Sequence, residues 1–76
     1  MFDEEPGAPL SGVTKRVLRF IRSYKAREHM APTVREIQGG CELSSTSAVD
    51  YQLELLEDRH RAITRKPNVA RSIMLT

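Results

Sequence analysis

The chain has 76 residues, a net charge of +2 and a single cysteine, which fits one small domain. A chain of this length buries only about 60% of the surface that its unfolded form exposes, so its core is marginal, and 76 residues leave no room for a second, catalytic domain. Cys41 has no partner for an intramolecular disulfide, and two separated histidines, His29 and His60, do not make a zinc ligand set. We therefore expect no metal and no other cofactor.

No apolar run approaches the roughly 20 residues of a membrane-spanning helix. The N-terminus, MFDEEPGAPLSG, is acidic, unlike the basic and apolar start of a signal peptide. These features predict a protein of the reducing cytoplasm with no membrane partner.

Charge divides the chain into an acidic start and a basic end. Three carboxylates lie in a stretch that also holds proline and glycine, and we expect residues 1–9 to form a flexible acidic arm. The domain expected over residues 10–76 then carries 12 basic and 7 acidic residues. The segment from Arg59 to Thr76 has five basic residues and no acidic one. Such an end indicates a polyanion partner, although a solvated basic tail has the same composition.

Apolar residues at helical spacing predict a first helix over about Ser11–Glu28. Ser11 is suited to cap its N-terminus. Ala31-Pro32 closes the region, because the residue before a proline is pushed out of helical dihedrals. The residues expected on the apolar face are Val13, Val17, Phe20, Ile21 and Tyr24.

The second predicted helix is short and has a signal at each end. Thr33 and Glu36 have the spacing of a capping box, and Val34 and Ile37 are its apolar positions. Gly39-Gly40 should end the helix, because glycine takes the left-handed conformation common at helix C-termini. Beyond it, Cys41 and Leu43 are expected to be small core residues, which for Cys41 is favoured over a redox or ligand role.

A third helix is predicted to start within Ser44–Ser47, where serine side chains can cap backbone N–H groups, and to end near Arg59. Val49, Leu53 and Leu56 form its core stripe. The residues left for its other faces are Ser47, Ala48, Asp50, Tyr51 and Glu54.

After the third helix, the apolar period becomes that of strands. Ile63, and then Arg71, Ile73 and Leu75, fit two short strands, with a turn at Lys66-Pro67-Asn68 between them. Three helices followed by a β-hairpin give a mostly α fold with a small β-hairpin, the winged helix-turn-helix.

In a DNA-binding helix-turn-helix, the second helix of the pair enters the major groove. The third predicted helix is therefore the candidate reading element. Its first turn suits phosphate, because small hydroxyls let the backbone approach and the helix N-terminus offers N–H groups, so Ser45 and Thr46 are expected there. Serine can bond several bases, alanine can meet a thymine methyl, and aspartate can accept from cytosine N4. The residues expected at base edges are Ser47, Ala48, Asp50 and Tyr51.

This same helix is acidic, since it also holds Glu54, Glu57 and Asp58. Carboxylates repel phosphate, so the cations of a DNA interface must come from other elements. The candidates for the DNA backbone are Lys15, Arg16, Arg35, Arg65, Lys66 and Arg71. The alternative is a winged helix that binds another protein, because a serine-rich run is a good N-cap in any helix.

Catalysis has little support. Gly39-Gly40 is not a phosphate-binding loop, and neither histidine belongs to a recognisable nucleophile motif. Composition allows a serine–lysine hydrolase, but nothing in the sequence favours one. We therefore predict a protein that is not an enzyme.

Four stretches, in the same order and at nearly the same spacing, resemble the N-terminal DNA-binding domain of LexA-type SOS repressors. They are VLRFIRSY (Val17–Tyr24), APTVREI (Ala31–Ile37), LSSTSAV (Leu43–Val49) and PNVARSIML (Pro67–Leu75). The resemblance covers about Leu10 to Leu75. It implies a winged helix-turn-helix that binds a palindromic operator as a dimer, with the hairpin near Lys66–Arg71 along the DNA backbone. It also implies base reading from the first half of the third helix, by Ser45, Ser47, Ala48, Asp50 and Tyr51.

The chain departs from this family in three places. Glu42 stands where family members have a glycine before the leucine of the turn. His60 stands where a glycine usually follows the third helix, and Arg61 is about one residue extra. The family's C-terminal domain, with its dimerisation and Ser–Lys self-cleavage machinery, is not in the sequence. We expect a complete, divergent small protein, from a phage or mobile element, in preference to a fragment of a longer repressor.

The leading hypothesis is a cytoplasmic regulator of a bacterial or phage-infected cell that binds double-stranded DNA, a repressor at SOS-type palindromic operators that dimerises on DNA. One alternative is a protein-interaction module of the same fold, an anti-repressor or inhibitor that acts through its acidic arm or third helix. Another is an architectural DNA binder in recombination.

Overall fold

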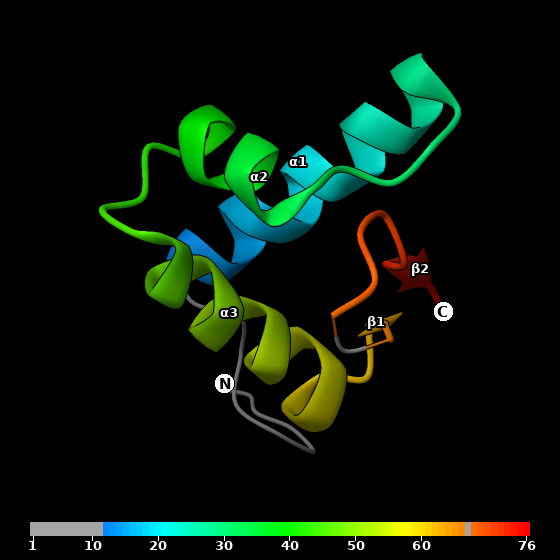
Figure 1. The fold of residues 1–76 in the computed structure, drawn as a ribbon. Coiled ribbons are helices and arrows are strands. Elements are labelled where there is room, and N and C mark those ends of the chain that lie inside the picture. Colours follow the sequence, from blue (N-terminus) through cyan, green and yellow to red (C-terminus); the bar gives the residue numbers. More distant parts are fainter. Residues whose placement is uncertain (1–11, 67) are drawn as a thin grey trace.

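A computed structural model describes residues 12–66 and 68–76 of the chain. Three helices lead into a two-stranded hairpin, and α2 and α3 follow one another across a short turn (Figure 1). The expected acidic arm over residues 1–9, the Ser11 cap and Pro67 of the predicted turn lie outside the described residues. The arrangement is the predicted winged helix-turn-helix, with the hairpin as the wing.

Helix α1 (Gly12–Glu28) ends where predicted, and His29 follows it in the left-handed conformation with φ 61°. Its buried face is rotated from the predicted one. Val17 and Ile21 are buried as expected, but the other buried residues are Thr14 and Leu18, whereas the predicted Val13, Phe20 and Tyr24 are only half-buried. The rotation brings Thr14 onto α3, where its Oγ1 donates to Oε1 of Gln52 at 2.6 Å.

Helix α2 (Val34–Gly40) begins with the predicted capping box: Thr33 Oγ1 accepts from Glu36 N, and Glu36 Oε1 accepts from Thr33 N. The helix ends at Gly40, as predicted, but the predicted left-handed glycine is wrong. The left-handed residue is Glu42, with φ 57°, and neither Gly39 nor Gly40 takes a positive φ. Leu43 N donates to Gln38 O at 3.0 Å, which closes a Schellman motif around Glu42.

Gly40 is required for a different reason. The aromatic ring of Phe20, on α1, lies where a Cβ of residue 40 would stand. Glycine therefore allows α1 and α2 to approach closely, and the left-handed turn falls to a residue that has a side chain.

Helix α3 (Thr46–Glu54) starts at the N-cap Ser45, whose side chain accepts from Ala48 N at 3.2 Å. The predicted stripe of Val49, Leu53 and Leu56 is completely buried. The last five residues, Leu55–Arg59, continue the axis as a π-helical segment, η1, so the helical stretch ends at the predicted Arg59.

The helical stretch ends in a π-helical turn just before Arg61, the residue that the resemblance predicts to be extra. His60 N donates to Leu55 O, five residues back, and Ala62 N donates to Leu56 O at 2.8 Å. A π turn contains one more residue than an α turn. Arg61 takes a φ of 54° and turns the chain towards the wing.

One core joins all of these elements and includes Cys41, which is 1% exposed. Its Sγ donates to Arg16 O at 3.9 Å, and burial raises the pKa of the thiol. The predicted packing role of Cys41 is confirmed. The buried apolar residues are Val17, Leu18, Ile21, Ala31, Ile37, Cys41, Val49, Leu53, Leu56, Ile63 and Ile73.

The wing is shorter than predicted. Strands β1 (Ile63–Thr64) and β2 (Met74–Leu75) pair antiparallel, with Ile63 opposite Leu75 and Thr64 opposite Met74. Arg71 was expected in the second strand, but it has a φ of 58° and belongs to the loop. Asn68 takes a φ of 60°, which agrees with its predicted place in the turn.

Polar contacts hold this short hairpin against the helices. Arg71 Nη1 and Nη2 donate to Oε1 and Oε2 of Glu36, both at 3.1 Å, and Nη1 also donates to Ala31 O at 2.9 Å. On the other side, Lys25 Nζ donates to Ile73 O at 3.4 Å. The hydrogen bonds from Arg71, together with the N–H of Thr33, lower the pKa of Glu36 from 4.5 to about 2.

Replacing Glu42 by glycine should raise the free energy of unfolding by about 1 kcal/mol, or several degrees in Tm, because a left-handed φ is unfavourable for a residue with a Cβ. Thermal melts followed by circular dichroism measure the change. Glu42→Ala is the matched control, since it removes the carboxylate but keeps the Cβ. An equal rise in Tm for the alanine variant would assign the effect to charge.

The wing contact should weaken in acid. Because the folded pKa of Glu36 lies below the unfolded value, its contribution is complete above about pH 4.5 and is lost as the pH falls towards about 2. Glu36→Gln should lower Tm at neutral pH and flatten the decline of Tm between pH 5 and pH 2, relative to the wild type.

Glu54→Gln is the control for that experiment, because it removes an exposed carboxylate of α3 that has no partner among residues 12–66 and 68–76. The assignment is contradicted if Glu36→Gln loses stability in acid as steeply as the wild type does.

Candidate nucleic-acid interface

The exposed face of α3 gathers three of the five predicted base-reading residues. Ser47, Asp50 and Tyr51 are exposed, and their spacing of three and four residues places them on adjoining parts of one helical face. Tyr51 is 60% exposed, an unusual position for a large aromatic side chain. A hydroxyl, a carboxylate and a phenol ring therefore stand out from the helix together.

The other two predicted base readers lie at the margin of this face. Ala48 is half-buried, and its backbone N–H donates to the Ser45 cap. Ser45 is also half-buried, and its oxygen is occupied by that bond. Thr46, the predicted phosphate contact, is exposed on the first turn of α3, where a helix offers unpaired N–H groups.

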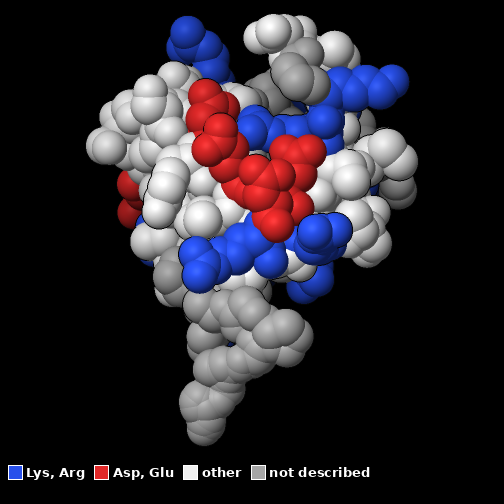
Figure 2. Space-filling view, turned by 90° about the horizontal axis from the view of Figure 1, so that it is seen from below, with Lys and Arg blue, Asp and Glu red and all other residues white. Residues whose placement is uncertain are grey.

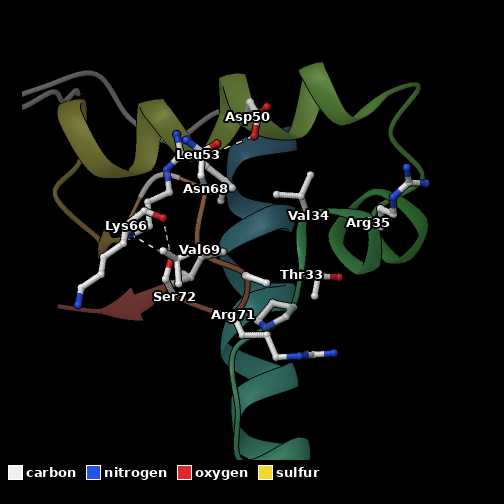
Figure 3. A pocket seen from close by; sticks show the side chains of 14 residues that line it. Thr33, Val34, Arg35, Asp50, Leu53, Lys66, Asn68, Val69, Arg71 and Ser72 are labelled. Carbon is white, nitrogen blue, oxygen red and sulfur yellow. Dashed lines mark hydrogen bonds and ion pairs between the residues drawn. The ribbon is translucent and has the colours of Figure 1, made fainter.

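A cavity of about 440 Å³ separates α3 from the wing and the start of α2. Asp50 and Leu53 line it from α3, and Val34 lines it from α2 (Figure 3). On the wing side, Asn68 and Val69 close it (Figure 3). The wing and the exposed face of α3 thus border one concave surface.

The four predicted backbone cations of α2 and the wing fall into two pairs. Arg35 and Lys66 are exposed, and their side chains have no hydrogen-bond or ion-pair partner within the described part of the chain. Figure 3 shows both side chains extending away from the cavity, on opposite sides of it. They are available to a phosphate on either flank.

The other pair, Arg65 and Arg71, forms ion pairs with carboxylates of the same chain. Arg71 bonds Glu36, as described above, and its pKa is raised by those hydrogen bonds. Arg65 Nε lies 3.3 Å from Glu57 Oε1, and its Nη1 lies 3.7 Å from Asp50 Oδ1. The sequence predicted phosphate contacts for both arginines, and the structure shows that each has a carboxylate partner in the same chain.

The surface around α3 is strongly acidic. Carboxylates of α3 and η1 follow one another along the axis at Asp50, Glu54, Glu57 and Asp58. In the view from below, where α3 lies in Figure 1, acidic side chains form a stripe across the middle of the surface, with lysines and arginines beside it (Figure 2). We call the row Asp50, Glu54, Glu57 and Asp58 the acidic stripe.

Sequence reasoning missed the roles of Glu57 and Glu36. Glu57 forms an ion pair with Arg65, and Glu36 forms one with Arg71. From the sequence, Glu57 was predicted only to contribute to the negative charge of the third helix. Their spacing from those arginines, 8 residues for Glu57 and 35 for Glu36, has no local signature. No signal in the sequence identifies these two pairs, because the contacts form only once the wing folds back on the helices.

The described residues offer neither a metal site nor a membrane-spanning helix. Within residues 12–66 and 68–76, no group of three His, Cys, Asp or Glu side chains could hold a metal ion. None of the helices in this part of the chain is long and apolar enough to span a membrane.

Comparison with known proteins identifies the fold's relatives. The family model described as LexA DNA binding domain matches residues 7–72. The chain is 38% identical over 66 residues to the LexA repressor of Roseiflexus sp. (strain RS-1), which covers 87% of this chain and 30% of that protein. It is 40% identical over 75 residues to the LexA repressors of Parafrankia sp. (strain EAN1pec) and Frankia alni, covering 95% of this chain and 29% of each.

The chain thus spans less than a third of the length of these relatives. The family match extends from before α1 into the wing loop and includes every residue of the exposed α3 face. The chain belongs to the LexA DNA-binding domain family.

Proposed function

We propose that this chain binds double-stranded DNA in a sequence-specific way and acts as a transcriptional repressor in a bacterial cytoplasm. The observation that carries the proposal is the exposed group of Ser47, Asp50 and Tyr51 on the second helix of a helix-turn-helix, beside a wing, in a chain of this family. Such a helix fits the major groove, where each base pair presents a distinct pattern of donors and acceptors.

The three side chains differ in what they can recognise. Asp50 can accept a hydrogen bond from cytosine N4, Ser47 can donate to or accept from several bases, and the ring of Tyr51 can contact a thymine methyl. We propose that Ser45 and Ala48, at the margin of the face, contact bases only where α3 lies deep in the major groove.

Phosphate contacts are proposed for Thr46, at the start of α3, and for the uncommitted cations Arg35 and Lys66. Arg71 was predicted in the same group. It can take part only with the guanidinium donors that Glu36 and Ala31 leave unused, which makes it a weaker candidate.

The relatives are called LexA repressors, and this name supports repression as the outcome of binding. We further propose SOS-type palindromic operators and a homodimer on DNA, because a two-fold symmetric site is matched by two copies of one reading helix. The proposal concerns this domain and not the remaining length of its relatives.

The acidic stripe favours a second candidate, binding to a basic protein surface. Its four carboxylates repel phosphate, and within the described residues only Asp50 and Glu57 have an ion pair, in which they share the single positive charge of Arg65. This candidate predicts no measurable affinity for any duplex.

A selection from random-sequence duplexes, followed by anisotropy titrations at several salt concentrations, separates the two candidates. A DNA-binding domain should select one site, and the log of its affinity should fall with the log of salt at a slope of roughly −3 to −6, or about −0.9 per phosphate contacted. Failure to select any sequence, with flat binding at low salt, contradicts DNA binding.

Substitutions should divide the interface into two classes. Ser47→Ala or Asp50→Ala should change which base is preferred at one position, by about tenfold, because base-edge contacts carry discrimination. Lys66→Ala should weaken binding to every duplex alike and reduce the salt slope by about 0.9. Selection with each variant gives the preferred base, and titration gives the slope.

Thr64→Ala serves as the wing control, because Thr64 is exposed and its side chain has no hydrogen-bond partner within the described residues. If Asp50→Ala leaves the selected site unchanged, the reading face is placed wrongly.

A further inference from the structure

Arg65 is the least exposed of the predicted DNA-contacting cations and sits between two carboxylates of the reading helix. Its side chain is 21% exposed, against 57% for Asp50 and 31% for Glu57. If Arg65 reached out to a phosphate, its side chain should be more exposed than the Asp50 carboxylate that it contacts. Here the order is reversed, since the carboxylate projects and the guanidinium lies behind it.

The contacts of Arg65 connect the wing to both halves of the helical stretch. Nε donates to Glu57 Oε1 at 3.3 Å, and Nη1 lies 3.7 Å from Asp50 Oδ1. Glu57 belongs to η1 and Asp50 to α3, so the planar guanidinium spans two turns of helix. Asp50 and Arg65 both line the cavity, and Figure 3 shows Asp50 on α3 at its edge.

This arrangement restricts Asp50 in two ways. The ion pair favours the rotamers that point the Asp50 carboxylate towards the guanidinium, and at 3.7 Å it is longer than a hydrogen bond, so both carboxylate oxygens can still accept. It also places a positive charge behind the first carboxylate of the acidic stripe, where that charge reduces the repulsion of nearby phosphates.

We propose that Arg65 is a positioning residue for base recognition, which holds the Asp50 carboxylate in its reading orientation while Glu57 anchors the guanidinium. The proposal rests on the function proposed above and gives Arg65 a role in specificity in place of the predicted phosphate contact. Its chemical target is the exocyclic amine of a base, presented to Asp50 in the major groove.

The test begins with the base pair whose preference changes in Asp50→Ala, found by selection with the full chain. Anisotropy titrations then give the ratio of Kd values for duplexes that differ only at that pair. Glu57→Gln should reduce this ratio about fivefold to tenfold, within the range of one base contact, although Glu57 itself is not proposed to touch DNA.

Asp58→Asn is the matched control, because it removes the same charge from the neighbouring residue and Asp58 has no partner within the described residues. If the only effect were the loss of a negative charge, both variants should bind all duplexes more tightly by the same factor, and the ratio of Kd values should not change. A drop in the ratio for Glu57→Gln, but not for Asp58→Asn, therefore reports positioning.

Arg65→Ala should lower the ratio by about tenfold with a change in salt slope well below 0.9. Arg65→Lys should recover the overall affinity but not the ratio, because an ammonium is a point charge and cannot span two carboxylates as a planar fork does. The double variant Asp50→Ala/Arg65→Ala should discriminate no worse than Asp50→Ala alone.

The proposal is overturned if Arg65→Ala leaves the ratio unchanged and reduces the slope by about 0.9, which is the behaviour of a phosphate contact. It is also overturned if Glu57→Gln behaves like Asp58→Asn, a test that does not depend on the folding of any Arg65 variant. A wild-type chain that selects no duplex refutes the proposed function itself, whereas a selected site unaffected by these variants refutes only the role of Arg65.

Discussion

The paired hydrogen bonds between Arg71 and Glu36 determine where the wing lies. Two residues in each strand cannot fix a hairpin by themselves, because such a ribbon is marginally stable in water. The same guanidinium also reaches the carbonyl of Ala31, and Glu36 is held in turn by the capping box of α2. The start of α2 and the loop of the wing are therefore one hydrogen-bonded unit, and the concave surface beside α3 takes its shape from that unit.

Turns in this domain depend on residues that strain the backbone. His29, Glu42, Arg61, Asn68 and Arg71 all take left-handed φ values between 54° and 61°. Each has a Cβ, so each turn is less favourable than the same turn made with glycine. The turns persist because the core and the hydrogen bonds beside them, such as the Schellman bonds around Glu42, determine the chain's path. The fold is thus defined by its packing and needs no glycine at its turns.

Local chemistry made much of the fold predictable. The capping box at Thr33, the N-cap at Ser45 and the stripe of Val49, Leu53 and Leu56 depend on residues within one or two turns, and the sequence predicted all of them. Thr14 could not be found in this way, because its burial depends on a hydrogen bond to Gln52, 38 residues away. The positions of Arg65 and Arg71 were missed for the same reason. The sequence predicted that Ser47, Asp50 and Tyr51 share the exposed face of α3, but not that Arg65 contacts Asp50.

The acidic stripe has a consequence for how such a domain would search a chromosome. Carboxylates beside the groove weaken the sequence-independent attraction on which sliding along DNA depends. On the proposed function, visits to unrelated sequence would be short, and the protein would redistribute mainly by leaving one stretch and meeting another. If Asp50 reads bases as proposed, it would gain a hydrogen bond only where a base offers a donor, so the repulsion would be offset at the right site and persist at the wrong ones. A recognition helix with this charge would stay for a shorter time on random DNA, because it would dissociate from it faster.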